Sequence, residues 1–351
     1  MRIFISLAFI LTFFTSRATD STWNQLSSKF YHTTVRVNHI QPKVEKNVIS
    51  SLQLIDLRHD KDRLGLYSNN LYSPYEILLE KGETLETLFN QKIVGNSTPG
   101  KKILIVIQDL WMTDIFPASQ AGKNDGKPVI VTSKLICKAD VFLKENETFV
   151  PLTRLDTTIW DKRKINIACT DLLEDLLSLL HQNINNEILA NEYASRKKLN
   201  LEFLKNHYSK KLATTFNTNT VFKKGIYKTY DDFRNNTPTN VDFEITESDD
   251  EPAMLYIKDG KGTGQLTRDV WGVNDGKNSY IMQGGHVFRL YKNENAFYWM
   301  GLKIIRVKTV GVPAGVPLGG GWFLVGLEPM GTRVKFRTTP YLLNLEKGIS
   351  Y

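Results

Sequence analysis

The sequence predicts an α+β fold in two parts: an N-terminal α+β domain, with helices covering a mixed or antiparallel sheet, and a mainly β domain after it. Apolar runs of strand type alternate with helical periodicity up to about residue 212. From residue 224, short β-type runs recur about every ten residues between Gly, Asn and Asp turns. Hydrophobic residues make up 41% and charged residues 23%, as in ordinary globular proteins, which argues against disorder and against a multi-span membrane protein.

The chain begins with the pattern of a secretory signal peptide. Residues 1–2 contain an arginine, residues 3–14 are apolar, and small residues stand at Ser16 and Ala18. This apolar run is too short for a bilayer core, which needs about 20 residues. We expect cleavage after Ala18, so that residues 1–18 are removed and the rest is exported to the periplasm or the cell surface.

The predicted N-terminal domain covers residues 19–212. Strands are expected at 35–40, 52–57, 102–107, 129–142 and 148–152. The run at 102–107 is rich in branched apolar residues and should lie at the centre of the sheet, buried on both faces. Helices are expected at 85–89 after Gly82 and Thr84, at about 170–184, and at about 186–212. The last two should cover one face of the sheet.

A Thr- and Asn-rich stretch, with a linker assigned to 213–223, precedes the predicted β domain at 224–351. Its strands are expected at 241–245, 254–257, 279–282, 287–291, 297–308, 321–327 and 334–336. Residues 310–327 carry no charge, but Pro313, Pro317 and several glycines would interrupt a membrane helix. We therefore expect no transmembrane helix in the mature chain. The segment is interpreted as a mobile apolar loop that contacts a partner or a lipid surface.

The densest group of chemically capable side chains lies at residues 56–65. Asp56, Arg58 and Asp60 are candidate binding residues, but the spacing lacks the glycine and glutamate of an EF-hand calcium loop. A charged turn with Arg58 paired to an aspartate is the structural alternative. A hydrolase would instead use two such carboxylates across a cleft, either Asp56 with Asp60 or Asp269 with Asp275.

Aromatic residues provide a second candidate surface. An exposed aromatic platform for a glycan or a peptide could use Trp271, Tyr280, Tyr291, Tyr298 and Trp299, with Asp275 in the Asp-Gly turn that follows Trp271. Aromatic residues in strands more often fill a core, so packing is the competing interpretation.

Cysteine and histidine usage limits the remaining chemistry. Cys137 and Cys169 either form one disulfide in an oxidising compartment or are two buried thiols, and the sequence leaves both open. The six histidines lack zinc-site spacing, so neither a metal nor a cofactor is expected. After removal of the signal, 43 basic residues face 37 acidic ones, and this net charge of +6 is spread along the chain. Nucleic acid is not an expected partner.

Two resemblances support an envelope setting. Residues 225–238 (GIYKTYDDFRNNTP) and 270–281 (VWGVNDGKNSYI) resemble a pattern found in uncharacterised secreted proteins of Bacteroidota. Val273 and Asn274 depart from that pattern. Asp56, Arg58 and Gly65 are similar to an element of small periplasmic lipoproteins of α+β fold. Neither resemblance implies a reaction or a catalytic residue.

The sequence therefore predicts an exported cell-envelope protein without enzymatic activity, which binds another envelope protein or an envelope polymer. A secreted hydrolase acting on glycan or peptide is the alternative. No Walker phosphate loop, GxSxG elbow or HExxH motif specifies a reaction.

Overall fold

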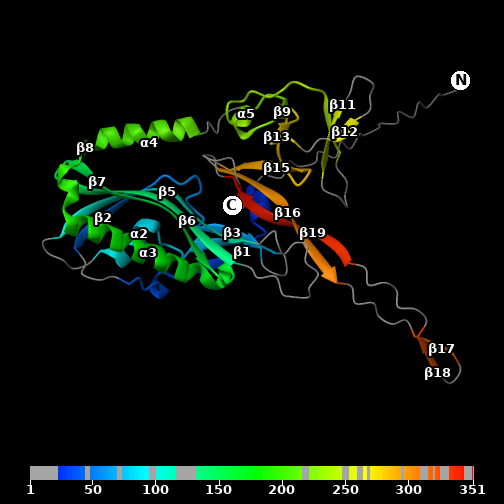
Figure 1. Cartoon of the computed structure of the whole chain (residues 1–351), viewed down its shortest axis with the longest axis horizontal. Helices are drawn as coiled ribbons and strands as arrows, with labels where there is room; N and C mark the ends of the chain where they lie inside the picture. Colours follow the sequence, from blue (N-terminus) through cyan, green and yellow to red (C-terminus); the bar gives the residue numbers. More distant parts are fainter. Residues whose placement is uncertain are drawn as a thin grey trace, which may run out of the picture.

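The computed structural model describes residues 23–43, 48–68, 73–94, 100–115, 132–215, 221–246, 253–258, 264–266, 269–293, 296–308, 315–318, 321–324, 332–343 and 350. The predicted signal peptide at 1–18 lies outside the described residues. The fold is mixed α+β and contains more strand than helix (Figure 1). Among the described residues, no helix is both long and apolar enough to cross a membrane.

The N-terminal part is built on a large mixed sheet with the order β1-β4-β3-β5-β6-β7-β8, and β2 also pairs with β5. Its strands are β1 (Tyr31–Val35), β2 (Ile49–Asp56), β3 (Gly65–Ser68), β4 (Pro74–Leu79), β5 (Lys101–Ile115), β6 (Thr132–Glu145), β7 (Thr148–Asp161) and β8 (Leu199–Asn200). Its helices are α1 (Trp23–Ser27), η1 (Val37–His39), α2 (Leu85–Ile93), α3 (Ile165–Ala190), η3 (Glu192–Ser195) and α4 (Leu201–Thr215).

The strand β5 forms the centre of this sheet, as its apolar run predicts. Its first half pairs in parallel with β2, and β3 meets it further along at Gly65 and Met112. On its other side, β5, β6 and β7 form a long antiparallel meander. The predicted strand at 35–40 is wrong beyond residue 35, because the chain turns there into η1.

Alternate residues of β5 face two different layers. Ile103 and Ile105 belong to an aliphatic core with α2 and α3, while Leu104 and Val106 pack with Leu204 and Tyr208 of α4 (Figure 1). The expectation that both long helices cover one face is therefore wrong. The two faces of β5 are equally apolar, so each attracts its own helix.

The predicted continuous helix at 186–212 is also wrong. The helix α3 ends at Ala190, and Asn191 adopts the left-handed conformation with φ of 57°. Asparagine tolerates this conformation better than most residues, so it suits the end of a helix. After η3 and β8, the side chain of Asn200 accepts a hydrogen bond from the backbone N–H of Phe203 at 2.7 Å, at the start of α4.

The C-terminal part contains a sheet of order β19-β16-β15-β14-β13-β9, a small sheet of order β10-β11-β12, and the hairpin β17–β18. Its elements are β9 (Gly225–Tyr227), α5 (Tyr230–Arg234), β10 (Phe243–Thr246), β11 (Met254–Lys258), β12 (Gly264–Leu266), β13 (Gly272–Asn274), β14 (Ser279–Gln283), β15 (His286–Asn293), β16 (Ala296–Lys308), β17 (Gly315–Leu318), β18 (Gly321–Leu324) and β19 (Thr332–Leu342). Within the segment 310–327, interpreted above as a mobile loop, residues 315–318 and 321–324 form this hairpin. The other residues of that segment lie outside the described part of the chain.

Aromatic rings form the core of the larger C-terminal sheet. Phe233 of α5 is fully buried and lies against Phe222, Trp271 and Tyr227, with ring centroids between 4.2 and 5.3 Å apart. The short helix α5 is fixed by a capping box in which Thr229 and Asp232 bond each other's backbone N–H. The predicted Asp-Gly turn is present, with Gly276 at φ of 98°.

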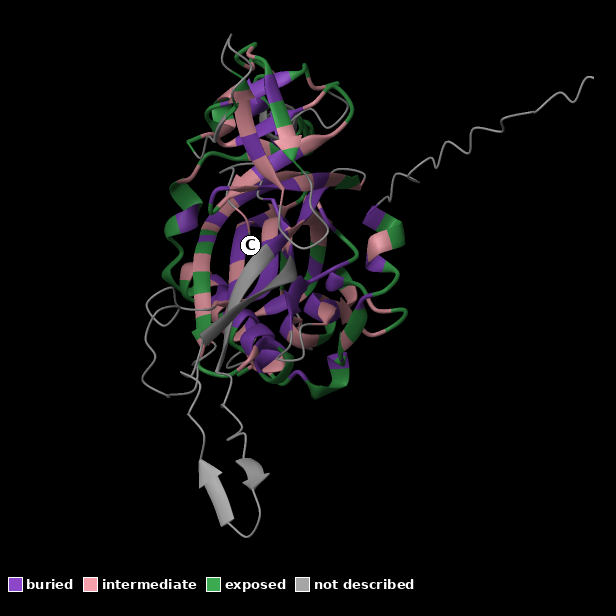
Figure 2. Ribbon diagram, turned by 90° about the vertical axis from the view of Figure 1, so that its right-hand side faces the viewer, coloured by how far each residue is buried: buried purple, intermediate pink, exposed green. Residues whose placement is uncertain are grey.

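The two parts of the chain pack against each other through a shared core, here called the junction. It contains Trp23 and Phe30 from the N-terminus, Leu66 and Trp111 from the large sheet, and Ala296, Tyr298 and Leu342 from the C-terminal sheet. Figure 2 shows buried residues in both sheets. The division into two domains, with a linker at 213–223, stays a prediction.

Candidate functional site

The turn that follows β2 brings together the three candidate residues of the N-terminal part. Arg58 is 5% exposed and binds Asp56 with three side-chain hydrogen bonds: Nε donates to Oδ1 and Oδ2 at 3.0 and 3.1 Å, and Nη2 donates to Oδ2 at 2.9 Å. The same guanidinium donates to the backbone carbonyls of Lys61 and Arg63. Arg58 therefore holds the turn in shape, as expected for a charged turn in which it pairs with an aspartate.

Asp60 connects this turn to the C-terminal sheet. Its Oδ1 accepts the backbone N–H groups of Asp62 and Arg63 at 3.0 and 3.1 Å. Its Oδ2 accepts a short hydrogen bond from the phenol of Tyr298 in β16, and Nη1 of Arg63 lies 3.4 Å away. A single buried carboxylate thus has partners from both parts of the chain.

Arg63 and Glu76 complete this buried network. The Nε of Arg63 donates to Oε1 of Glu76 at 2.6 Å, and Oε2 of Glu76 lies 3.4 Å from Nδ1 of His32. Arg63 also lies 5.8 Å from the centroid of the Tyr298 ring, within the range of a cation–π contact. We call Asp60, Arg63, Glu76 and Tyr298 the junction network.

Electrostatics keep Arg63 and Tyr298 of the junction network protonated. Burial opposes the charge on Arg63, but Asp60 and Glu76 outweigh it and raise the pKa of the guanidinium above its ordinary value. Burial, followed by the negative charge of Asp60, raises the pKa of the Tyr298 phenol far above its ordinary value. Tyr298 therefore remains a hydrogen-bond donor throughout the physiological pH range.

A stacked pair of rings covers the network. Trp23 of α1 stacks on Tyr298 with centroids 4.3 Å apart and planes 6° from parallel. Tyr291, a predicted binding residue, is partly buried beside Trp23 at 6.1 Å, and the guanidinium of Arg289 lies 5.4 Å from its ring. These rings pack the junction, so Tyr291 contributes to a core more than to a platform.

The remaining predicted binding residues lie apart from the junction network, in the C-terminal sheet. Trp271 is partly buried against Tyr230 and Phe233, at 5.3 and 4.5 Å. Asp275 accepts backbone N–H groups of residues 277 and 278 at 2.6 Å, and the phenol of the buried Tyr280 at 3.2 Å. Trp271, Asp275 and Tyr280 therefore serve the turn and the core, and the structure does not join them to Asp56, Arg58 and Asp60.

Both cysteines are buried free thiols, so the structure contains no bond between them. Cys137 lies within β6, opposite Leu110 and Thr157 on the neighbouring strands, and Cys169 lies in the first turns of α3. The disulfide alternative is thus not realised here, and both thiols are buried in the same aliphatic core as free groups. Burial raises the pKa of both thiols, which suppresses the reactive thiolate.

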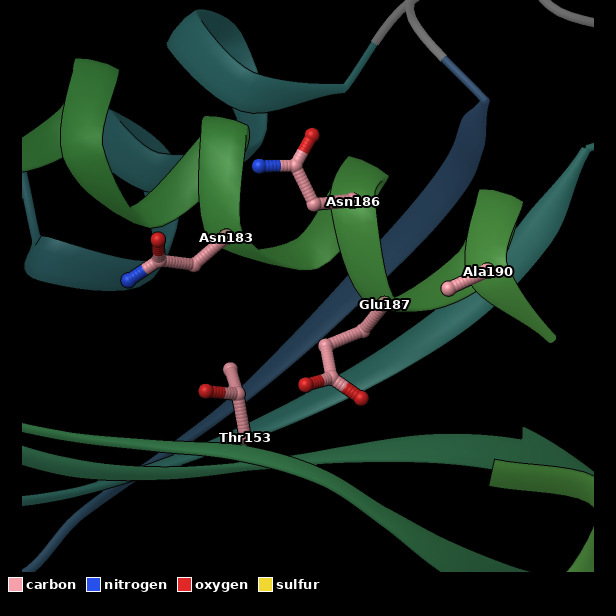
Figure 3. A pocket seen from close by; sticks show the side chains of 5 residues that line it. All are labelled: Thr153, Asn183, Asn186, Glu187 and Ala190. Carbon is pink, nitrogen blue, oxygen red and sulfur yellow. The ribbon is translucent and has the colours of Figure 1, made fainter. Parts of the chain in front are cut away.

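A polar depression of about 350 Å³ lies between β7 and the C-terminal half of α3. Its lining includes Thr153, Asn183, Asn186, Glu187 and Ala190 (Figure 3). Glu187 is engaged by Nη2 of Arg196 at 2.7 Å, and that arginine also donates to the Pro151 carbonyl at 3.1 Å. The one charged residue among the lining residues named here, Glu187, is therefore paired within the protein.

The sequence reasoning missed Arg63, Glu76 and Tyr298 as partners of Asp60. Glu76 offered a signal, because it is an acidic residue inside the otherwise apolar strand Pro74–Leu79. Tyr298 was expected to belong to an exposed aromatic platform, and it is instead buried against Asp60, which lies 238 residues earlier in the chain. Among the described residues, no cluster of three or more His, Cys, Asp or Glu side chains is arranged to hold a metal ion.

Comparisons with known proteins give little further information. A scan against protein-family models finds no match, and a search of curated proteins finds none either. One solved structure, described only as an uncharacterized protein, aligns with a TM-score of 0.27 and 10% identity, covering 45% of this chain and 99% of its own. A similarity this low carries no argument about the fold or the function.

Proposed function

We propose that this chain is an exported, non-enzymatic protein of the cell envelope, periplasmic or surface-exposed, which binds another envelope protein or an envelope polymer. The proposal rests on one observation: the candidate catalytic carboxylates Asp56 and Asp60 are bonded to other side chains of the protein. Asp56 is held by Arg58, and Asp60 is buried under Tyr298 and Arg63. A general acid or base must reach its substrate, and these carboxylates instead bond their own chain.

Other features support a binding role. The signal-peptide pattern and the resemblance to secreted Bacteroidota proteins favour the envelope setting. The apolar segment 310–327 provides a candidate contact with a partner or a membrane surface. The junction connects this C-terminal part to the large sheet through buried contacts.

Cross-linking in intact cells, followed by affinity recovery from separated periplasmic and membrane fractions, tests the proposal. We expect one defined envelope partner, recovered with the native chain and with an Asp56→Asn variant alike. A hydrolase would instead be recovered as a lone soluble species whose turnover of glycan or peptide is lost in Asp56→Asn. That second result would overturn the proposal.

A further inference from the structure

The outer side of β7, away from β6, is mostly unpaired. The strand β8 covers only the first two residues of β7. Just beyond them, Nη1 of Arg196 donates to the backbone carbonyls of Pro151 and Leu152. Among the residues that the structure describes, no strand pairs with the outer side of residues 153–161. We call residues 153–161 the open edge.

The open edge lacks the features that usually keep one edge strand from pairing with another. Natural sheets protect their edges with lysine, proline or bulges. Residues 153–161 read TRLDTTIWD and contain neither lysine nor proline. The β6–β7 ladder is also regular along them, because its register shift lies before residue 153. Threonine and isoleucine favour extended backbone, so the open edge is suited to accept a further strand.

The two faces of the open edge have different surroundings. Leu155 and Ile159 pack on the aliphatic core, and Thr153 points toward α3 (Figure 3). The alternate residues lie on the opposite face by the two-residue period of a strand, and all of them are exposed: Arg154, Asp156, Thr158 and Trp160. Trp160 is 60% exposed, so its ring is available to a second chain.

The open edge is complementary to a second copy of itself. Thr157 is its central residue, so a two-fold axis through Thr157 pairs two antiparallel copies along the whole open edge. On the core face, Leu155 of each copy then lies opposite Ile159 of the other. The apolar face of each sheet therefore continues across the axis into the next.

The exposed face is matched in the same register. Arg154 lies opposite Trp160 of the second copy, a pairing that suits a cation–π contact. The Arg154 side chain is 56% exposed and 3.8 Å from Asp140, so it can reach that ring. Asp156 lies opposite Thr158, and no like charges face each other.

Other two-fold registers fit less well. An axis at Asp156 would place the two aspartates directly opposite each other, which destabilises a sheet. An axis at Leu155 or at Thr158 would leave part of the open edge unpaired. The axis at Thr157 is therefore the one that uses the whole edge without repulsion.

We propose that two copies of this chain associate through their open edges, antiparallel and with the two-fold axis at Thr157, so that their large sheets form one continuous sheet. A strand of another protein would need a matching sequence of its own, whereas a second copy supplies one by symmetry. The inference goes beyond the proposed function, because an exported binding protein and a hydrolase can each associate in this way.

Cysteine substitution in the otherwise native chain tests the register. Residues directly opposite in an antiparallel ladder have Cα atoms about 4.5–5.5 Å apart, within the range of a disulfide. Under mild oxidation, Thr157→Cys should form a covalent dimer in non-reducing electrophoresis. Cys137 and Cys169 are buried, so the native chain should stay uncross-linked.

Thr153→Cys is the matched control for the cross-link. The two copies of residue 153 would lie about 27 Å apart along the ladder, so this variant should stay uncross-linked as well. Cross-linking of neither variant, or of both to the same extent, would overturn the inference.

A pair of charge variants tests the contact without a covalent bond. Thr158 is exposed and lies opposite Asp156 of the second copy. Thr158→Lys should tighten the dimer about tenfold and Thr158→Asp should weaken it about tenfold, since the symmetry repeats the pair twice. Sedimentation equilibrium of the full chain measures the dissociation constant.

Ser209→Lys and Ser209→Asp make the same changes at an exposed position of α4 and should leave the dissociation constant unchanged. All these charge variants change exposed side chains, so their folding is not at stake. A native chain with the mass of a single copy at every concentration would overturn the inference. Equal effects of Thr158→Lys and Thr158→Asp would do so too.

Discussion

The two parts of this molecule use different kinds of side chain to build their cores. The large N-terminal sheet packs aliphatic residues of β5, β6 and β7 against α2 and α3, with α4 on the opposite face. Among the described residues, the C-terminal part contains one helix, the short α5, and the core of its larger sheet consists mostly of aromatic rings. A small number of large rings can thus bury as much apolar surface as a long helix does, because each ring buries about 150–250 Å².

The largest expected effects compare these two cores directly. Phe233→Ala should lower the free energy of unfolding by about 3–5 kcal/mol, and Leu176→Ala by about 2–5 kcal/mol, since both side chains are fully buried. Because the junction connects the two cores, we expect both variants to lower the same transition in chemical denaturation. Two transitions, each lowered by one variant alone, would show that the parts unfold independently. Leu189→Ala is the control, since that side chain is 67% exposed.

The next effect concerns the junction itself. Tyr298→Phe removes the phenol that donates to the buried Asp60 while keeping the stacked ring, so stability should fall by about 1.5–3 kcal/mol, as for a hydrogen bond to a charged group. Denaturation monitored by tryptophan fluorescence and by circular dichroism measures it. Tyr31→Phe, at a ring 57% exposed, should change little. An unchanged stability in Tyr298→Phe would show that the hydrogen bond does not stabilise the junction.

Helix caps allow a smaller comparison of the two parts. Thr84 caps α2 in the N-terminal part, and Thr229 forms the capping box of α5 in the C-terminal part. Each substitution by alanine should lower stability by about 1 kcal/mol. Thr229→Ala should have the larger effect, since it also weakens the second bond of the capping box, from the Thr229 backbone N–H to the Asp232 carboxylate. Substitution by serine, which retains the hydroxyl, should restore most of the loss in thermal unfolding.

The smallest expected effect is on the pH dependence of the free energy of unfolding, and it comes from a histidine buried in α3, His181. Burial of His181 lowers its pKa in the folded state below the ordinary 6.5. Above pH 6.5, His181 is neutral in both the folded and the unfolded chain, so its protonation does not affect the free energy of unfolding. As the pH falls below 6.5, the unfolded chain gains a proton that the folded chain resists, so stability decreases.

The variant His181→Leu should therefore lose less stability than the native chain between about pH 7 and pH 5. Urea denaturation at the two pH values measures the difference. His39→Gln changes an exposed histidine and should retain the native pH dependence. A native dependence in His181→Leu would assign the effect to other groups.

Local signals in the sequence predicted much of the secondary structure. Thr84 marks the start of α2, and the run at 102–107 marks the central strand, because each signal depends only on neighbouring residues. The face covered by α4 could not be predicted in the same way. Ile103 and Leu104 are equally apolar, so the strand pattern does not state which helix covers which face.

The candidate site was predictable only in part. Asp56 and Arg58 are two residues apart, and their pairing follows from the turn that contains them. The partners of Asp60 come from β4 and β16, which no local pattern connects to residue 60. Aromatic residues were ambiguous for another reason, since strand periodicity does not separate a buried ring from an exposed platform, as Trp271 illustrates.

The position of Trp23 at the junction has a consequence for the order in which this protein folds. Trp23 and Asp60 are synthesised early, whereas Tyr298 follows Asp60 by 238 residues. Contacts of such long sequence separation form slowly, because the intervening chain loses entropy when it closes. The junction can therefore close only after Tyr298 has been synthesised. Until then the indole of Trp23 lacks its stacking partner, so the segment around Trp23 stays accessible to chaperones.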